Sequence, residues 1–163
     1  MIIALGISYF LAYFIVKAFK KHLFKPIILF DIHGVLLKGD FNLEDFTEIP
    51  GTRKLIHQLR NKYTVAAFTN MSSELYGFWS KKWDFEGSFD YTFCSGRIGV
   101  KKPDEASFKR ILRVLGVKAK DVIFFDDVEA NVASAKKVGI RGVVFKNPAQ
   151  AREALEAMGV KAY

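Results

Sequence analysis

The sequence predicts a three-layer α/β fold, in which a Rossmann-like parallel sheet is covered by helices on both faces. From Pro26 onward, short apolar segments rich in Ile, Val or Phe alternate with segments whose apolar residues recur at helical spacing, such as Leu55, Ile56 and Leu59. Repeated β–α units of this kind favour a parallel sheet that is buried on both faces. Polar residues suited to chemistry follow three of the apolar segments, at the strand ends where such sheets bind ligands.

The expected strands are short and apolar, and they span residues 27–31, 64–69, 90–94, 121–126 and 141–145. The expected helices span residues 51–62, 73–82, 104–116, 129–139 and 148–158. Several helix ends carry local signals. Asn147 and Pro148 form an N-cap followed by proline at the first helical position, and Gly116, Gly139 and Gly159 each follow a periodic run.

The bulk composition indicates one domain and gives no reason to expect nucleic-acid binding. The chain has 163 residues, and we divide it into an N-terminal segment, residues 1–24, and a core domain, residues 25–163. The net charge is +8, but four lysines before the first acidic residue contribute +4, so the rest of the chain carries +4 (8 − 4). Such a weak excess equally suits a basic rim that attracts phosphorylated substrates.

The N-terminal segment is strongly apolar. Residues 2–16 carry no charge and are followed by three lysines. A helix over these residues is about 22 Å long, and about 27 Å when it is extended to Phe19, near the roughly 30 Å of a hydrocarbon core. We therefore expect residues 2–19 to anchor the protein in a membrane, with the catalytic domain on the lysine-rich, cytoplasmic side. The alternatives are a helix docked on the protein or a mistaken start codon, which would make the protein cytoplasmic.

Polar residues suited to chemistry occur in four groups. The first strand ends on a carboxylate, Asp31, and Gly34 lets the chain turn sharply just after it. Two adjacent carboxylates, Asp126 and Asp127, close another apolar strand; they would repel each other without a cation, which favours a metal site. In chain order the groups are Asp31, Thr69–Asn70, Lys102–Pro103–Asp104 and Asp126–Asp127.

This order of motifs resembles the haloacid dehalogenase (HAD) superfamily, whose members are mostly magnesium-dependent phosphatases. The stretch from Val100 to Ala149 is similar to the subfamily of sugar-phosphate phosphatases and epoxide hydrolase N-terminal domains, and the resemblance covers roughly residues 26–160. Those relatives usually insert a helical cap after the first motif. Here residues 37–50 have room only for a short flap, and the stretch from Asn70 to Lys102 has no room for a second cap. The resemblance therefore implies a capless HAD-like core.

The resemblance also implies a role for each group. Asp31 would attack phosphorus and form an aspartyl-phosphate, and Thr69 together with the backbone amide of Asn70 would hold the phosphoryl group. Lys102 would screen the charge of the nucleophile and of the phosphate. Oxygen ligands suit Mg²⁺, and the expected ligands are Asp31, the backbone carbonyl of His33, Asp127 and the neighbouring Asp126. Without a cap the site is expected to be open, which favours a large or exposed phosphorylated substrate.

His33 is the departure from the family pattern, because similar phosphatases carry a second aspartate at this position. That aspartate protonates the leaving oxygen and then activates water. A histidine can exchange a proton near neutral pH, so His33 can in principle do both. The substitution predicts a slow phosphatase, and it leaves open a catalytically weak or inactive binding module at the membrane surface. Carbon–halogen hydrolysis is a third alternative, but it has no need of the carboxylate-rich metal site.

An aromatic cluster follows the Thr69 loop. We expect it mainly to pack into the core along the edge of the sheet, and an exposed part could instead form a homodimer or docking surface. The nearby single cysteine, Cys94, is expected to be a small buried hydrophobe. The cluster consists of Tyr76, Phe78, Trp79, Trp83, Phe85, Phe89 and Tyr91.

Overall fold

The computed structural model describes residues 25–40 and 45–162 and contains the expected parallel sheet. Its five strands lie in the order β5-β4-β1-β6-β7, and all neighbouring pairs are parallel. Residues 1–24, 41–44 and 163 lie outside the described residues. The strands are β1 (Ile27–Phe30), β4 (Val65–Thr69), β5 (Tyr91–Cys94), β6 (Val122–Asp126) and β7 (Arg141–Val144).

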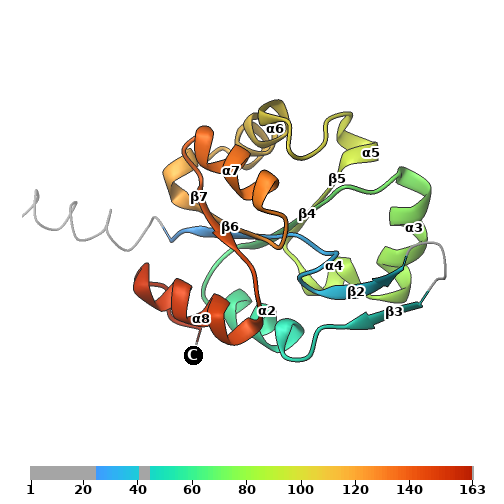
Figure 1. Ribbon diagram of the computed structural model, residues 1–163, viewed down its shortest axis with the longest axis horizontal. Helices are drawn as coiled ribbons and strands as arrows, with labels where there is room; N and C mark the ends of the chain where they lie inside the picture. Colours follow the sequence, from blue (N-terminus) through green and yellow to red (C-terminus); the bar gives the residue numbers. More distant parts are fainter. Residues whose placement is uncertain (1–24, 41–44, 163) are drawn as a thin grey trace, which may run out of the picture.

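Helices cover both faces of this sheet, as Figure 1 shows. On one face lie α6 (Glu105–Leu115) and α7 (Glu129–Lys137), and on the other lie α2 (Thr52–Arg60) and α8 (Pro148–Ala157). The helices α3 (Ser73–Lys82), α4 (Phe85–Ser88) and α5 (Ser95–Ile98) surround the β5 end of the sheet. The predicted three-layer, Rossmann-like arrangement is therefore confirmed.

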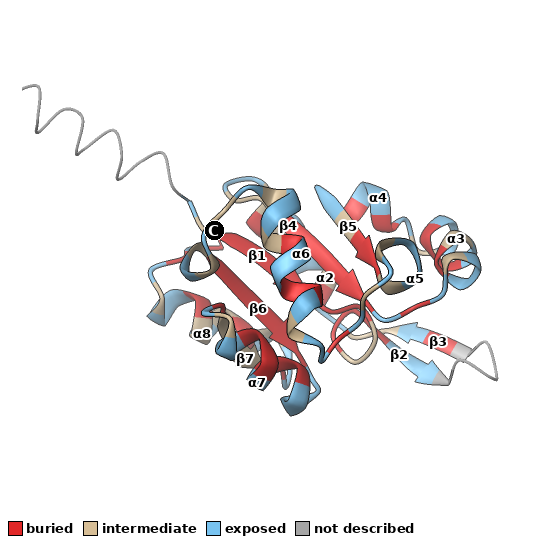
Figure 2. Cartoon of the chain, turned by 90° about the horizontal axis from the view of Figure 1, so that it is seen from above, coloured by how far each residue is buried: buried red, intermediate tan, exposed pale blue. Residues whose placement is uncertain are grey.

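Alternation along β1 explains the three layers. Ile27 and Leu29 belong to the same buried cluster as Phe108 of α6, whereas Ile28 and Phe30 belong to the cluster that includes α2 and α8. Successive side chains of a strand point to opposite faces, so one apolar strand contributes to both cores. The strand is buried throughout because helices lie above and below it (Figure 2).

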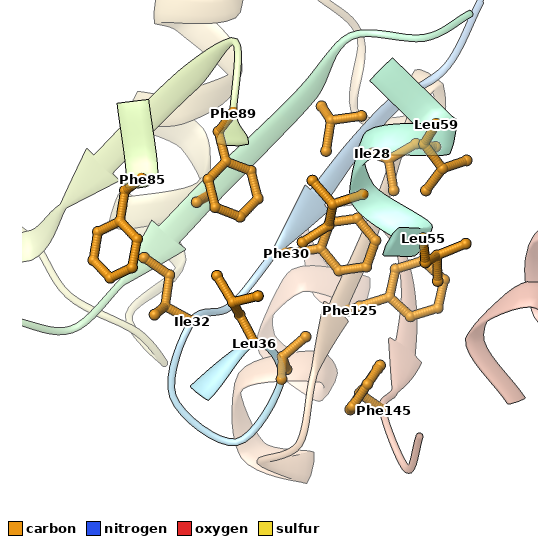
Figure 3. Packing of buried hydrophobic residues seen from close by; sticks show 14 of the residues in the cluster. Ile28, Phe30, Ile32, Leu36, Leu55, Leu59, Phe85, Phe89, Phe125 and Phe145 are labelled. Carbon is orange, nitrogen blue, oxygen red and sulfur yellow. The ribbon is translucent and has the colours of Figure 1, made fainter. Parts of the chain in front are cut away.

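The core on the α2 side is built around a pair of stacked rings. Phe30 of β1 and Phe125 of β6 have ring centroids 5.2 Å apart and planes inclined by 18°. Leu55 and Leu59 of α2 pack in the same cluster (Figure 3). Pairing β1 directly with β6 brings the two rings together, and it also aligns the ends of these strands.

The sequence did not predict the smaller elements. The stretch expected to be a short flap is an antiparallel hairpin of β2 (Leu37–Asp40) and β3 (Asp45–Glu48). The helices α4 and α5 have four residues each, and a short 3-10 helix spans Ala119–Asp121. Segments of this length have too few residues to display a helical or strand period.

No cap is inserted among the described residues. Between β1 and α2, the described residues 31–40 and 45–51 form the β2–β3 hairpin and the turns beside it. Between β4 and Lys102 it forms α3, α4, β5 and α5, which belong to the sheet and its surroundings. The expectation of a capless core is therefore confirmed.

One expectation requires correction. Within residues 25–40 and 45–162, no helix is long and apolar enough to cross a membrane. The longest of them, α6, has 11 residues and is about 16 Å long, against the roughly 30 Å of a hydrocarbon core. The prediction of a membrane-anchored protein is not supported by this finding, and residues 2–19, on which it rested, lie outside the described residues.

Most of the aromatic cluster is in the core. Four of its members are buried, namely Tyr76, Trp79, Phe85 and Phe89. Phe78 and Tyr91 remain about half exposed. Cys94 is buried, and its thiol donates to the carbonyl of Met71. The interpretation as core packing therefore holds for the buried members.

Candidate active site

Three neighbouring strands end at one place and carry polar side chains there. Asp31 directly follows β1, Thr69 ends β4 and Asp126 ends β6. β4 and β6 lie on either side of β1, so these three ends are adjacent at the carboxyl edge of the sheet. The backbone N–H of Asp31 donates to the carbonyl of Phe125 at 2.8 Å, which fixes the carboxylate close to β6.

The ammonium group of Lys102 lies between two of the carboxylates. Its Nζ is 2.8 Å from Oδ1 of Asp31 and 2.7 Å from Oδ2 of Asp126. All three side chains are buried. Charge-assisted hydrogen bonds are strong in such surroundings, and each carboxylate would be costly to bury without its partner. The sequence order alone therefore identified three groups that the fold brings into direct contact.

Asp126 is held by two further donors. The Asn131 amide Nδ2 lies 3.0 Å from each carboxylate oxygen, and the backbone N–H of Val128 donates to Oδ1 at 2.9 Å. Because both oxygens are occupied, the Asp126 side chain has a fixed orientation. Asn131 is itself buried at the start of α7, immediately after this strand end.

Asp127 packs against the backbone of Gly34. A β-carbon added to Gly34 would lie 2.1 Å from Oδ2 of Asp127, so a side chain at this position requires Asp127 to move. Gly34 also has a φ of 83°, a left-handed conformation that favours glycine. The close approach places Asp127 beside the loop that follows Asp31.

The three carboxylates could hold a divalent cation. One oxygen from each of Asp31, Asp126 and Asp127 lies within 4.8 Å of the others. When ionised, they carry three negative charges against the single positive charge of Lys102, which leaves an excess of two. An all-oxygen donor set with this charge is what Mg²⁺ prefers. The residues present therefore fit a magnesium site.

Burial raises the pKa values of two of the carboxyl groups, those of Asp31 and Asp127. Burial raises the pKa of Asp31 to about 6; Lys102 opposes this effect, whereas the neighbouring Asp126 adds to it. Burial and the charge of Asp126 also raise the pKa of Asp127. A bound cation would favour the ionised forms of both groups, and it would lower both pKa values.

The side chain of His33 is held by the β2–β3 hairpin. Nε2 lies 3.0 Å from the carbonyl oxygen of Gly39 and donates to it when it carries a proton. The ring also meets the edge of Phe46, with centroids 5.9 Å apart and planes at 85°. His33 is thus next to the carboxylates in sequence, while its ring is oriented by the hairpin. Its roles as acid/base and as a carbonyl ligand remain predictions.

Asn70 makes a contact that sequence reasoning missed. Its side-chain Nδ2 donates to the carbonyl of Lys102 at 2.7 Å, and its Oδ1 accepts from the N–H of Lys102 at 2.9 Å. This two-bond clamp joins the loop after β4 to the segment that carries the buried lysine. Residues 70 and 102 are far apart in the chain, and no local pattern signals their pairing.

A family model described as haloacid dehalogenase-like hydrolase matches residues 42–139, which is more than half of the chain. The chain belongs to this family. It has the HAD-like fold, and its curated relatives include phosphatases.

Two HAD relatives align over most of the chain. Flavin mononucleotide hydrolase 1 of Arabidopsis thaliana is 30% identical over 130 residues, which is 74% of this chain and 53% of that protein. Glyceraldehyde 3-phosphate phosphatase of Pyrococcus abyssi is 28% identical over 117 residues, which is 69% of this chain and 48% of that protein. The chain thus spans about half the length of both relatives.

A solved HAD structure shares the fold. An enzyme of this family from Bacteroides thetaiotaomicron, crystallised with magnesium and inorganic phosphate, superposes with a TM-score of 0.66 at 21% identity. The match covers 76% of this chain and 95% of that chain. At this level of identity the likeness concerns the fold alone.

Replacing Gly34 tests the packing of Asp127. We expect Gly34→Ala to lower the free energy of unfolding by the left-handed strain, about 1 kcal/mol, and by a smaller further amount because the exposed carboxylate of Asp127 has to move. Gly159→Ala is the matched control, since Gly159 has a φ of 79° but nothing within 4 Å of an added β-carbon. Urea unfolding of both variants measures the difference, and equal losses would contradict the proposed close packing.

Proposed function

We propose that this protein is a Mg²⁺-dependent phosphomonoester hydrolase that acts through an aspartyl-phosphate on Asp31. The observation that carries the proposal is the position of the Asp31 carboxylate, beside the Lys102 ammonium and within an oxygen cluster of metal-binding size. Phosphoryl transfer needs a nucleophile and positive charge around the phosphoryl oxygens. Asp31, Lys102 and the charge excess that suits Mg²⁺ meet these needs.

The reaction divides into two displacements. In the first, an oxygen of Asp31 attacks phosphorus, the bond from phosphorus to the substrate oxygen breaks, and the departing alcohol takes up a proton. In the second, water attacks the aspartyl-phosphate, loses a proton and releases inorganic phosphate with the free carboxylate. Mg²⁺, held by Asp31, Asp127 and the neighbouring groups, would reduce the repulsion between carboxylate and phosphate.

The remaining residues bind the phosphoryl group and transfer protons. Thr69, buried at the end of β4, and the backbone amide of Asn70 hold the phosphoryl group, and Lys102 balances its charge. His33 donates the proton to the leaving alcohol and then accepts one from water. The names of the relatives, a flavin mononucleotide hydrolase and a glyceraldehyde 3-phosphate phosphatase, support a phosphomonoester as substrate. The capless architecture supports a large or exposed one.

A second candidate is a phosphate- or metal-binding module with little catalytic activity. The observation that favours it is the hydrogen-bond contact between His33 and Gly39, because it holds the ring against the hairpin. A ring held in this way has less freedom to exchange protons with a substrate.

Hydrolysis assays separate the two candidates. We expect release of phosphate from 4-nitrophenyl phosphate that requires Mg²⁺ and that falls by about a thousandfold or more in Asp31→Asn. This variant keeps the size of the side chain but removes the nucleophile. Equal activity of parent and variant would exclude the covalent mechanism. Tight Mg²⁺ binding without turnover would favour the binding module.

Replacing His33 tests the proton-transfer role. We expect His33→Ala to lower kcat by about a hundredfold or more for an alkyl phosphate, whose leaving group needs a proton. The loss is expected to be smaller for 4-nitrophenyl phosphate, whose leaving group departs readily as an anion. The exposed histidine on α2 provides the control variant, His57→Ala. Hydrolysis by His33→Ala at the parent rate would rule out the role.

The pKa of Asp31 predicts a pH-dependent response to Mg²⁺. Because the folded-state pKa is about 6, above the ordinary 3.8, the metal-free folded protein holds this proton more tightly than the unfolded chain does. This contribution to stability is present below about pH 4 and is lost as the pH rises through about 6. Mg²⁺ requires the ionised group.

We therefore expect the increase in Tm on adding Mg²⁺ to be larger at about pH 7.5 than at about pH 5. Thermal unfolding with and without Mg²⁺ measures it. Asp31→Asn is the control, because it removes the titrating group. An increase in Tm that does not change across this pH range in the parent would contradict the proposed ligand.

A further inference from the structure

Among the described residues, the β2–β3 hairpin packs closely against α3. The cavity between the hairpin and α3 has a volume of only about 10 Å³. His33 lines this cavity, and behind it Phe46 packs against Trp79 with ring centroids 4.6 Å apart. A space of this size holds no more than a water molecule. The leaving group of a substrate therefore does not fit in this cavity.

A groove with a volume of about 740 Å³ lies beside the site, and Asn70, which contacts Lys102, is one of its lining residues. Its walls are the loop after β4, α5 and the loop of residues 99–104. Two of its lining residues are the chain neighbours of site residues: Asn70 follows Thr69, and Lys101 precedes Lys102. Figure 2 shows α5, which carries the lining residues Ser95 and Gly96, next to the end of β5. The groove thus begins next to the phosphoryl position.

The walls of the groove are fixed by backbone contacts. The carbonyl of Met71 accepts from the Gly96 N–H at 2.9 Å, and the Met71 N–H donates to Oγ of Ser95 at 3.0 Å. A β-carbon on Gly96 would lie 2.6 Å from the backbone nitrogen of Ser73, so the two segments are in close contact. The groove is therefore a preformed feature of the fold.

The groove is lined by apolar residues, such as Val100, and by polar side chains of both charges. Lys101 and Asp104 are exposed, and the carboxylate of Asp104 also accepts from the Ala106 N–H at 2.9 Å as the N-cap of α6. Ser72 adds a hydroxyl group. An anionic leaving group would meet Asp104 and a cationic one would meet Lys101. A neutral group with several hydroxyls can donate to the carboxylate and accept from the ammonium.

We propose that the groove binds the leaving group of the phosphorylated substrate, and that Lys101 and Asp104 select a neutral, hydroxyl-rich leaving group of about nucleoside size. The volume of the groove lies within the roughly 300–1,000 Å³ of pockets that bury small organic ligands. The inference rests on the proposed phosphatase activity, and it adds where the substrate lies and which residues determine specificity.

Filling the groove tests the proposal. Val100 lines the groove and is half-buried, so Val100→Trp places a large ring in it. Val114→Trp is the matched control, because Val114 is 62% exposed on α6 and is not among the residues that line the groove. The measured quantity is the ratio of kcat/KM for adenosine 5′-monophosphate to kcat/KM for 4-nitrophenyl phosphate. We expect Val100→Trp to lower this ratio at least about tenfold and Val114→Trp to leave it unchanged.

A second variant removes charge without adding bulk. We expect Lys101→Ala to lower the same ratio about threefold or more through a higher KM for the nucleotide. Lys101→Ala also tests the groove proposal by itself if Val100→Trp fails to fold. A ratio that both variants leave within about twofold of the parent value would overturn the groove proposal. A parent that hydrolyses 4-nitrophenyl phosphate but not the nucleotide would overturn the ligand class. A parent with no Mg²⁺-dependent hydrolysis would instead overturn the proposed function.

Discussion

The ion pairs of Lys102 are the interaction on which the site depends. Two carboxylates, Asp31 and Asp126, end adjacent buried strands, and burying them there without a positive charge nearby would be costly. The lysine comes from a loop and not from the sheet, so its position has to be fixed from outside. The Asn70 clamp on the Lys102 backbone supplies this restraint. Two hydrogen bonds therefore join the loop expected to bind phosphate to the lysine expected to balance its charge.

The single positive charge of the Lys102 ammonium group does not balance the negative charges of three ionised carboxylates. Asp127 adds a third negative charge beside the same pair, and the raised pKa values of Asp31 and Asp127 follow from burial and from this repulsion. Such an arrangement costs stability unless a cation is bound, and it persists because other contacts fix each group. Asn131 orients Asp126, and Gly34 leaves space for Asp127. The excess of negative charge in the site is thus the physical reason to expect a divalent cation.

The surroundings of the site are asymmetric, so the two sides of the open site offer a substrate different amounts of space. On one side the β2–β3 hairpin, held by the contact between His33 and Gly39 and by aromatic packing on Trp79, leaves only a small cavity against α3. On the other side the loop after β4 and α5 border an open groove. In a protein without a cap among its described residues, we propose that these two edges discriminate between substrates.

The sequence by itself determined the strands, the longer helices and the identity of the chemical groups. Apolar periodicity is local, and Asp31, Thr69 and Asp126 could be placed together because parallel strands end at a common edge. Only the tertiary structure decided the pairing of Asn70 with Lys102, the packing of Asp127 on Gly34 and the orientation of the His33 ring. These contacts join residues that loops bring together, and loop conformation depends on packing with distant parts of the chain. The hairpin was also beyond prediction, because strands of four residues contain too few positions to establish a period.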